Sequence, residues 1–189
     1  PKVTFSITVA ESDEVVSRIS QNRASLGICL LNRIPPELQA QVLYREYFGL
    51  FCGPHHRLFH QPQIALSELE DERAVSFQTE VEGGALEPVT RLRLRAKIST
   101  RWSGVSSNLL ELRRMIVSNV GIGALPLHVA RADVSQGLLR QLPPYDELPL
   151  VNIYLLTNPR RRLSDAEAAL VKACNEMLQR VDLRERTYS

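Results

Sequence analysis

Apolar and polar residues alternate at the start of the chain, where every second residue between Val3 and Val9 is apolar. A period of two predicts a strand over residues 2–9, with one face buried more deeply than the other. The polar run at 11–14 offers a side-chain cap for a helix and places carboxylates in its first turn. It predicts a short helix that ends near Asn22, because asparagine tolerates left-handed backbone.

The next apolar run, 26–31, has apolar residues on both faces, as a strand covered on both sides must have. Strand, helix and buried strand in this order predict a right-handed βαβ unit. A further strand is expected over residues 41–52, and shorter ones at 74–77 and 95–102. Cations alternate over residues 91–97, and we interpret them as a solvated face rather than a phosphate site. They are Arg91, Arg93, Arg95 and Lys97.

Helical spacing is clearest in the second half of the chain. Asn108 and Glu111 fit a capping box, and the helix that they open is expected to end at 119–121. Ser164 and Glu167 form a second capping box before a C-terminal helix. The apolar face expected for that helix comprises Ala166, Ala169, Leu170, Ala173, Met177 and Val181. Between the two helices the sequence predicts strands at 122–125, 138–142 and 151–156, and helical turns at 127–133.

Composition places the chain among soluble globular proteins. It has 189 residues, 44% of them hydrophobic, and no apolar run approaches the ~18 residues that span a bilayer. The 23 cations exceed the 21 anions by only two, so no basic field indicates nucleic-acid binding by this piece. Since the chain begins with Pro1 and not Met, we expect it to be part of a longer protein, and its start has no signal-peptide layout.

The cysteines and histidines give no sign of a reactive centre. Cys29, Cys52 and Cys174 form no C-x-x-C pair, which favours a reducing compartment and core packing over a redox role. We interpret the histidines at 55, 56 and 60 as a solvated turn rather than a metal site. The cations at 160–162 are expected in an exposed loop. Recognised catalytic and nucleotide-binding motifs are missing, so no catalytic residue, metal or cofactor is expected.

Three segments, in their order and spacing, resemble a known family. They are Arg23–Leu30 (RASLGICL), Leu50–Leu58 (LFCGPHHRL) and Met115–Pro126 (MIVSNVGIGALP). Together they resemble the effector-binding domain of LysR-type transcriptional regulators, and the resemblance covers essentially the whole chain. Asn119 stands where the family usually has glycine, a change that the left-handed tolerance of asparagine accommodates.

The resemblance implies an α/β fold of the type 2 periplasmic-binding-protein kind, with two Rossmann-like lobes joined by two crossing strands. The first lobe would comprise residues 1–45 plus 152–189, and the second 46–151, with an effector cleft between them. The winged helix-turn-helix of the family is missing, as are the first strand and helix of the effector domain. Unpaired hydrophobic strand edges would result, so we expect residues upstream of Pro1 or another chain to supply a strand.

Open α/β sheets bind ligands beyond the carboxyl ends of their strands. Together with the resemblance, this rule predicts effector contacts at Glu11, Ser12, Leu30 and Leu31 in the first lobe, and at Phe77, Gln78, Thr79, Ser106, Ser107 and Asn108 in the second. Ser12 and Ser107 would donate hydrogen bonds to an acceptor such as a carboxylate, although plain helix capping also accounts for both. The apolar pair Leu30 and Leu31 favours a partly hydrophobic organic acid as the effector.

The predicted function is therefore effector sensing without catalysis. The resemblance implies a cytoplasmic homodimer or homotetramer that contacts DNA only through the missing N-terminal domain and has no membrane partner. The helix after Ser12 would pack near the Asn108 helix of a partner. A solute-binding protein of a transport system is the alternative, and would need an export signal upstream. An enzyme on this scaffold is a third interpretation, but the predicted residues offer it no catalytic group.

Overall fold

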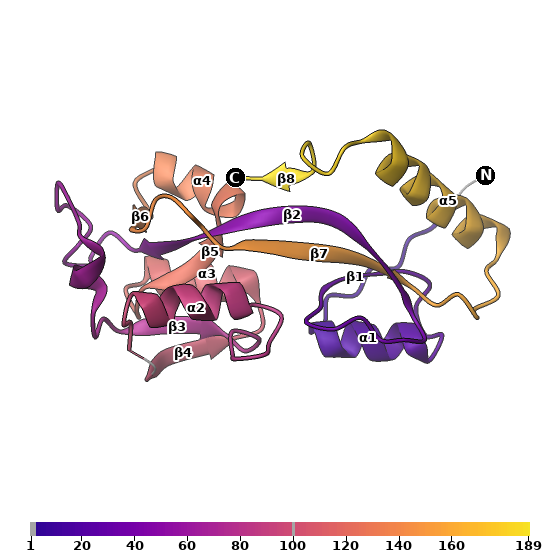
Figure 1. The fold of residues 1–189 in the computed structure, drawn as a ribbon, viewed down its shortest axis with the longest axis horizontal. Helices are drawn as coiled ribbons and strands as arrows, with labels where there is room; N and C mark the ends of the chain where they lie inside the picture. The colour runs from indigo at the N-terminus through magenta and orange to yellow at the C-terminus, as the bar shows by residue number, and fades with distance from the viewer. Residues whose placement is uncertain (1–2, 100) are drawn as a thin grey trace. The chain divides into compact units, whose positions relative to one another are not determined.

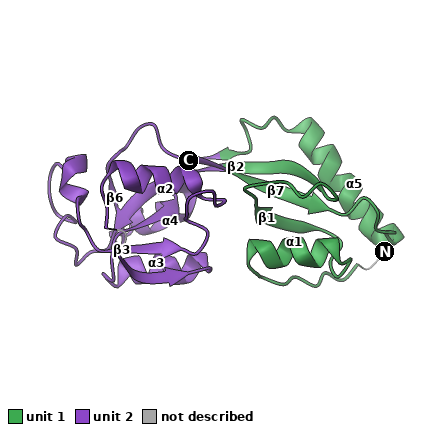
Figure 2. Cartoon of the chain, turned by 60° about the horizontal axis from the view of Figure 1, so that its bottom comes forward, with its two compact units in different colours: residues 1–45, 152–187 green, residues 46–151, 188–189 purple. Residues whose placement is uncertain are grey.

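The structure is a computed structural model that describes residues 3–99 and 101–189. The chain divides into two compact units, coloured separately in Figure 2. The first unit comprises residues 1–45 and 152–187, and the second comprises 46–151 and 188–189. Strands β2 (Gln39–Cys52) and β7 (Leu150–Thr157) contribute residues to both units.

The first unit is a sheet with a helix on each side (Figure 1). The sheet runs in the order β1-β7-β2, and β1 pairs antiparallel with β7. Helix α1 packs closely on β1, since a Cβ on Gly27 would lie 2.7 Å from Val15 Cγ1. The core of this unit is formed by Ile19, Cys29, Leu38 and Leu156. Its other elements are α1 (Ser12–Ser20), β1 (Gly27–Leu30) and α5 (Asp165–Arg180). The short strand β8 (Thr187–Tyr188) pairs with β2 and has one residue in each unit.

The strand predicted at 2–9 is wrong over the described residues 3–9, and Lys2 lies outside the described part of the chain. Phe5, Ile7 and Val9 are 63%, 87% and 87% exposed. A strand needs a hydrogen-bonded neighbour, and the described residues offer this segment none. The predicted βαβ unit is wrong as well, because its first strand does not form over the described residues. The strand at 26–31 is not covered on both sides as predicted, since Ile28 in β1 is 54% exposed. The expectation that a further strand completes this sheet stays a prediction.

The second unit surrounds its own apolar core with short strands and helices. Strand β2 pairs antiparallel with β5 and β6, whereas β3 and β4 form a parallel pair. The core cluster consists of Phe51, Val75, Leu112, Ile116, Leu125, Ala130 and Leu139. The elements of this unit are η1 (Leu66–Leu69), β3 (Ala74–Phe77), α2 (Glu87–Arg95), β4 (Trp102–Ser106), α3 (Leu109–Val117), β5 (Gly123–Pro126), α4 (Leu127–Ser135) and β6 (Arg140–Leu142).

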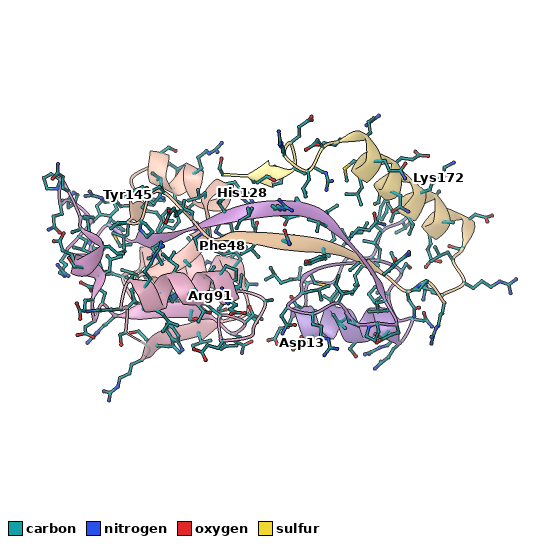
Figure 3. All side chains as sticks on the ribbon, in the orientation of Figure 1. Asp13, Phe48, Arg91, His128, Tyr145 and Lys172 are labelled. Atoms are coloured by element: carbon teal, nitrogen blue, oxygen red, sulfur yellow. The ribbon has the colours of Figure 1, made fainter. Side chains whose placement is uncertain are left out.

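The strand predicted at 95–102 is wrong, since helix α2 ends at Arg95 and β4 begins at Trp102; Thr100 lies outside the described residues. A proline in the first turn of α2 favours the helix, because its fixed φ suits that position. The cations on this helix do not share one solvated face. Arg91, labelled in Figure 3, is exposed, whereas Arg93 is buried.

Helix α5 has the predicted capping box between Ser164 and Glu167, but only part of the predicted face. Hydrogen bonds from Ser25, the Ser164 backbone and Arg161 lower the pKa of Glu167 to about 2. None of the helix residues is buried, and the alanines of the predicted face are exposed. Its partly buried side includes Leu170 and Met177 from the predicted face, together with Val171, Cys174 and Leu178. The left-handed backbone predicted at Asn22 and Asn119 is confirmed, with φ of 58° and 60°.

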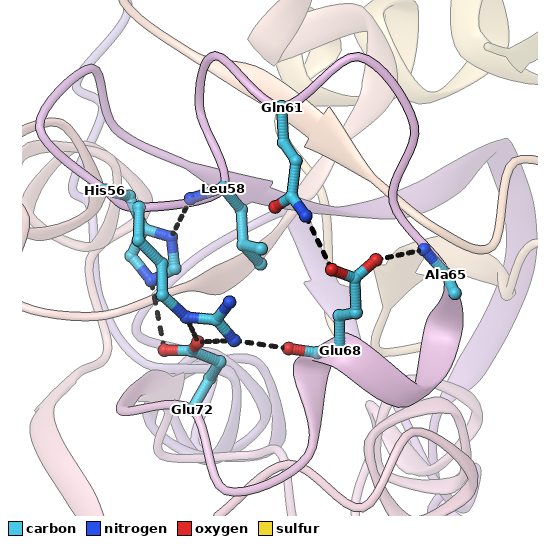
Figure 4. Close-up of polar contacts among 7 residues, drawn as sticks. His56, Leu58, Gln61, Ala65, Glu68 and Glu72 are labelled. Atoms are coloured by element: carbon cyan, nitrogen blue, oxygen red, sulfur yellow. Dashed lines mark hydrogen bonds and ion pairs between the residues drawn. The ribbon is translucent and has the colours of Figure 1, made fainter.

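The loop after β2 is held by side-chain hydrogen bonds (Figure 4). The solvated turn predicted for the histidines is wrong at His56, whose side chain is 10% exposed and lies 3.2 Å from Glu72 Oε2. Arg57 Nε donates to the same carboxylate at 2.5 Å. Further along, Glu68 accepts from Gln61 at 2.6 Å and from the Ala65 N–H at 2.7 Å. These bonds fix a long loop that contains only one turn of 3-10 helix.

Candidate functional site

The candidate residues of the first unit meet where β1 ends and α1 begins. Ser12 Oγ accepts a hydrogen bond from the Leu30 N–H at 3.3 Å, so the start of the helix is tied to the end of the strand. Glu11 is the N-cap residue of α1, in extended backbone and without a side-chain capping bond. Leu31 is partly buried against the core of this unit. Helix capping therefore does not explain Ser12, whose hydroxyl hydrogen can still be donated.

The charge around this first group is negative. Asp13 and Glu14 lie in the first turn of α1, next to the exposed Glu11. Glu14 is paired with Arg18 at 2.6 Å. The other two carboxylates, those of Glu11 and Asp13, flank Ser12 in the sequence. Like charges repel, so this end of the helix suits a neutral or apolar part of a ligand better than an anionic one.

The candidate residues of the second unit gather at the carboxyl ends of two parallel strands. Phe77 and Ser106 are register partners in β3 and β4, and the Gln78 N–H donates to Ser106 O at 3.3 Å. The Asn108 N–H donates to Ser106 Oγ at 3.0 Å. Gln78, Ser107 and Asn108 are exposed. The structure thus brings the start of α3 and the two strand ends into one group, which Thr79 and Ser107 complete.

Asn108 caps helix α3. Its Oδ1 accepts from the Leu110 and Glu111 N–H groups at 2.9 and 3.2 Å. Half of the predicted capping box is present, because the Glu111 side chain pairs with Arg114 instead. Since Asn108 is the cap, Ser107 is not one, and its exposed hydroxyl stands beside the positive end of a helix dipole. The second group therefore suits the anionic part of a ligand.

Two buried charged residues next to the second group were not predicted from the sequence. Glu80 follows the candidate residues of β3 and is 2% exposed, and Arg93 on α2 is 3% exposed. Their side chains form an ion pair. Each residue type is ordinarily solvated, and no local pattern links positions 13 residues apart. No sequence signal could have paired them.

A surface pocket of about 540 Å³ lies elsewhere on the second unit, at the end of α2. None of the predicted residues lines it. Its lining comprises Asp71, Leu94, Lys97, Ile98, Ser99 and Arg101. Lys97 is paired with Glu70 at 3.3 Å and is 70% exposed. Such a solvated cation holds a ligand weakly, so we assign no site to this pocket.

The cysteines and the metal-ligating residue types give no reactive centre in the described residues. Burial raises the pKa of Cys29 and of Cys52 to about 11, so both are thiols rather than reactive thiolates. His, Cys, Asp and Glu side chains nowhere gather in threes to hold a metal ion within residues 3–99 and 101–189. Among the same residues, no helix has the length and apolar character to cross a membrane.

The fold consists of two compact units to which β2 and β7 both contribute. The family model for the LysR substrate binding domain matches residues 1–179, and the chain belongs to this family. The predicted fold class, the type 2 periplasmic-binding-protein-like fold, is confirmed by this match and by the structural similarities.

Curated relatives are transcriptional regulators. The chain is 22% identical over 174 residues to the uncharacterized HTH-type transcriptional regulator YwbI of Bacillus subtilis, covering 89% of the chain and 55% of YwbI. It is 29% identical over 94 residues to the HTH-type transcriptional regulator PtxR of Pseudomonas aeruginosa, covering 50% of the chain and 30% of PtxR. The chain therefore spans about half the length of the first of these relatives and less of the second.

Solved structures share the fold at low sequence identity. The regulatory domain of HypT from Salmonella typhimurium has a TM-score of 0.72 at 16% identity, with 94% of this chain and 84% of that one covered. The effector-binding domain of QuiR in complex with shikimate has a TM-score of 0.71 at 15% identity, with 90% and 79% covered. The regulatory domain of CcmR from Synechocystis in complex with 2-PG has a TM-score of 0.68 at 19% identity, with 93% and 84% covered.

Proposed function

We propose that this chain is the ligand-sensing domain of a LysR-type transcriptional regulator and binds a small-molecule effector without transforming it. The observation that carries the proposal is the meeting of candidate residues at the carboxyl ends of β3 and β4, where Gln78 bonds to Ser106 beside the start of α3. Family membership supports it. Two structural neighbours, the domains of QuiR and CcmR, are solved with shikimate and with 2-PG.

The two groups of residues differ in charge and polarity, and the difference favours an organic acid with an apolar part. The second group offers the Ser107 hydroxyl beside a helix N-terminus, a setting that stabilises a carboxylate. The first group offers the apolar side chains of Leu30 and Leu31, together with the carboxylates at the start of α1. We therefore propose that the second group binds the carboxylate of an organic-acid effector.

Calorimetric titration of paired variants tests this assignment with benzoate, hexanoate and shikimate as probes. Ser107→Ala should weaken binding of the preferred acid by about tenfold, the loss typical of one hydrogen bond to a charged group. Ser103→Ala, which removes an exposed hydroxyl from β4, is the matched control and should bind normally. Equal affinities of the two variants, or a preference for a small and wholly polar ligand, would contradict the proposal.

Regulation would follow from a shift between populations. An effector that binds one conformation of the domain better than another increases the population of that conformation. The change in population alters the position of a linked DNA-binding domain. We propose that the working form is a homodimer or homotetramer and that DNA is contacted only through that further domain. Sedimentation equilibrium, run with and without the preferred acid, measures the oligomeric state, and a monomer throughout would refute this part. The curated relatives are regulators, which favours this function over solute transport.

A further inference from the structure

The turn that follows β3 is closed by a buried ion pair. The side chains of Arg93 and Glu80 are 4% and 0% exposed, and Arg93 Nε donates to Glu80 Oε1. The second carboxylate oxygen accepts from Ser76 Oγ at 3.2 Å and from the Phe77 N–H at 3.4 Å. The Glu80 N–H donates back to Phe77 O at 3.1 Å. Both the side chain and the backbone of Glu80 therefore fix the start of the turn.

Arg93 joins this turn to both strands of the second group. It lies on α2, and its Nη2 donates to Val75 O in β3. Its guanidinium carbon stands 4.9 Å from the ring centre of Trp102 in β4, where the face of an indole attracts a cation. One side chain thus contacts the two strands whose ends carry the candidate residues.

The outer side of the same turn is held by backbone contacts. Thr79 O accepts a hydrogen bond from the Leu86 N–H at 3.4 Å. Gly84 packs so closely that a Cβ there would lie 2.4 Å from Thr79 O. The Gln78 N–H is bonded to Ser106 O. Residues 77–79 are therefore fixed from α2, from β4 and from the loop before α2.

A buried ion pair does little for net stability, because apolar residues of similar volume often replace it without loss. It does restrict conformation, since a buried charge that leaves its partner is strongly disfavoured. We propose that Arg93 and Glu80 are positioning residues for effector binding, which hold residues 77–79 in the conformation that meets the ligand. This inference rests on the proposed function of the same residues.

The test compares two double variants by amide hydrogen exchange without ligand and by calorimetry with benzoate, hexanoate and shikimate. Glu80→Leu with Arg93→Met removes the buried pair at similar volume. Glu87→Leu with Arg91→Met removes an exposed pair from the same helix and is the control. The first variant should exchange its amides at 77–80 about tenfold faster and bind the preferred acid about tenfold more weakly, with melting unchanged. The control should match the wild type in both measurements.

Each other outcome is decisive. Unchanged exchange at 77–80, or unchanged affinity despite faster exchange, overturns the positioning role. A buried-pair variant that fails to fold also overturns it, because the pair then serves the whole unit. A second variant, Gly84→Ala, keeps the pair but displaces Thr79 O, and should also weaken binding. If the wild type binds none of the acids while 77–80 still exchanges faster, the proposed ligand class fails but the control of the turn by Glu80 and Arg93 stands.

Discussion

Glu46 makes the stability of the protein depend on pH. It lies in β2, is 7% exposed, and burial raises its pKa from 4.5 to about 7. His128 on α4 lies close to it, with Nε2 3.9 Å from Glu46 Oε2. Burial and then the charge of Arg131 lower the pKa of His128, which weakens any compensation of the Glu46 carboxylate by this imidazole. Arg45, the adjacent cation, is bonded to Asn152 instead.

Whether stability rises or falls with pH depends on which state, folded or unfolded, binds the proton of Glu46 more tightly. The pKa of Glu46 is higher in the folded state, so its contribution to stability is fully present below pH 4.5 and is lost as pH rises toward about 7. A rise from 4.5 to about 7 corresponds to a loss of about 3 kcal/mol, since one pKa unit is about 1.4 kcal/mol. Glu46→Gln replaces the neutral acid with an amide of the same shape and removes this loss.

Urea denaturation followed by circular dichroism measures the effect. The Glu46→Gln variant should exceed the wild type in free energy of unfolding by about 1 kcal/mol at pH 5 and about 3 kcal/mol at pH 8. Glu82→Gln, at an exposed position, controls for the loss of one negative charge. A difference between Glu46→Gln and wild type that is the same at both pH values would refute the reasoning, because burial would then not set the affinity of Glu46 for its proton.

Three further predictions concern local structure. Ser164→Ala should lower the free energy of unfolding by about 1 kcal/mol in thermal or urea melts, because α5 loses its cap; no change would mean that α5 adds nothing to the cooperative unit. Gly53→Ala should cost about 2 kcal/mol in the same melts, since the new Cβ would lie 2.3 Å from Ile116 O; a cost below that of Gly83→Ala would contradict this. Amides at 3–9 should exchange at nearly unprotected rates, and slow exchange there would show that the segment is paired.

Features that depend only on residues close together in the sequence were predicted well. The cap at Asn108, the capping box at Ser164 and the left-handed Asn119 all depend on neighbours within a few residues. The segment 3–9 failed because a strand depends on a distant partner, which its own alternation does not supply. Helix α2 was not predicted, because the alternating cations at 91–97 hid the helical spacing of the buried Val89 and Leu92.

The candidate site was predicted in part. The rule that loops beyond strand ends carry ligands selected Phe77 and Ser106, which the structure pairs in register. Their binding of an effector stays a prediction. The same rule is silent on Glu80 and Arg93, because burial of a charge depends on a partner in another element. Sequence patterns therefore do not reveal the buried polar residues that contact the candidate residues from the protein interior.

The two units differ in the buried polar residues that the described chain contains. All five lie in the second unit, and they are Glu46, Ser76, Glu80, Arg93 and Asp133. Asp133 accepts from Arg113 and so ties α4 to α3, while Glu80 and Arg93 tie α2 to β3. The cluster at the centre of the first unit is apolar, and apolar contacts are not directional. Because a buried charge tolerates few arrangements, the second unit has the more narrowly specified conformation. We infer that the buried ion pair of Glu80 and Arg93 gives the turn after β3 a fixed conformation within the second unit.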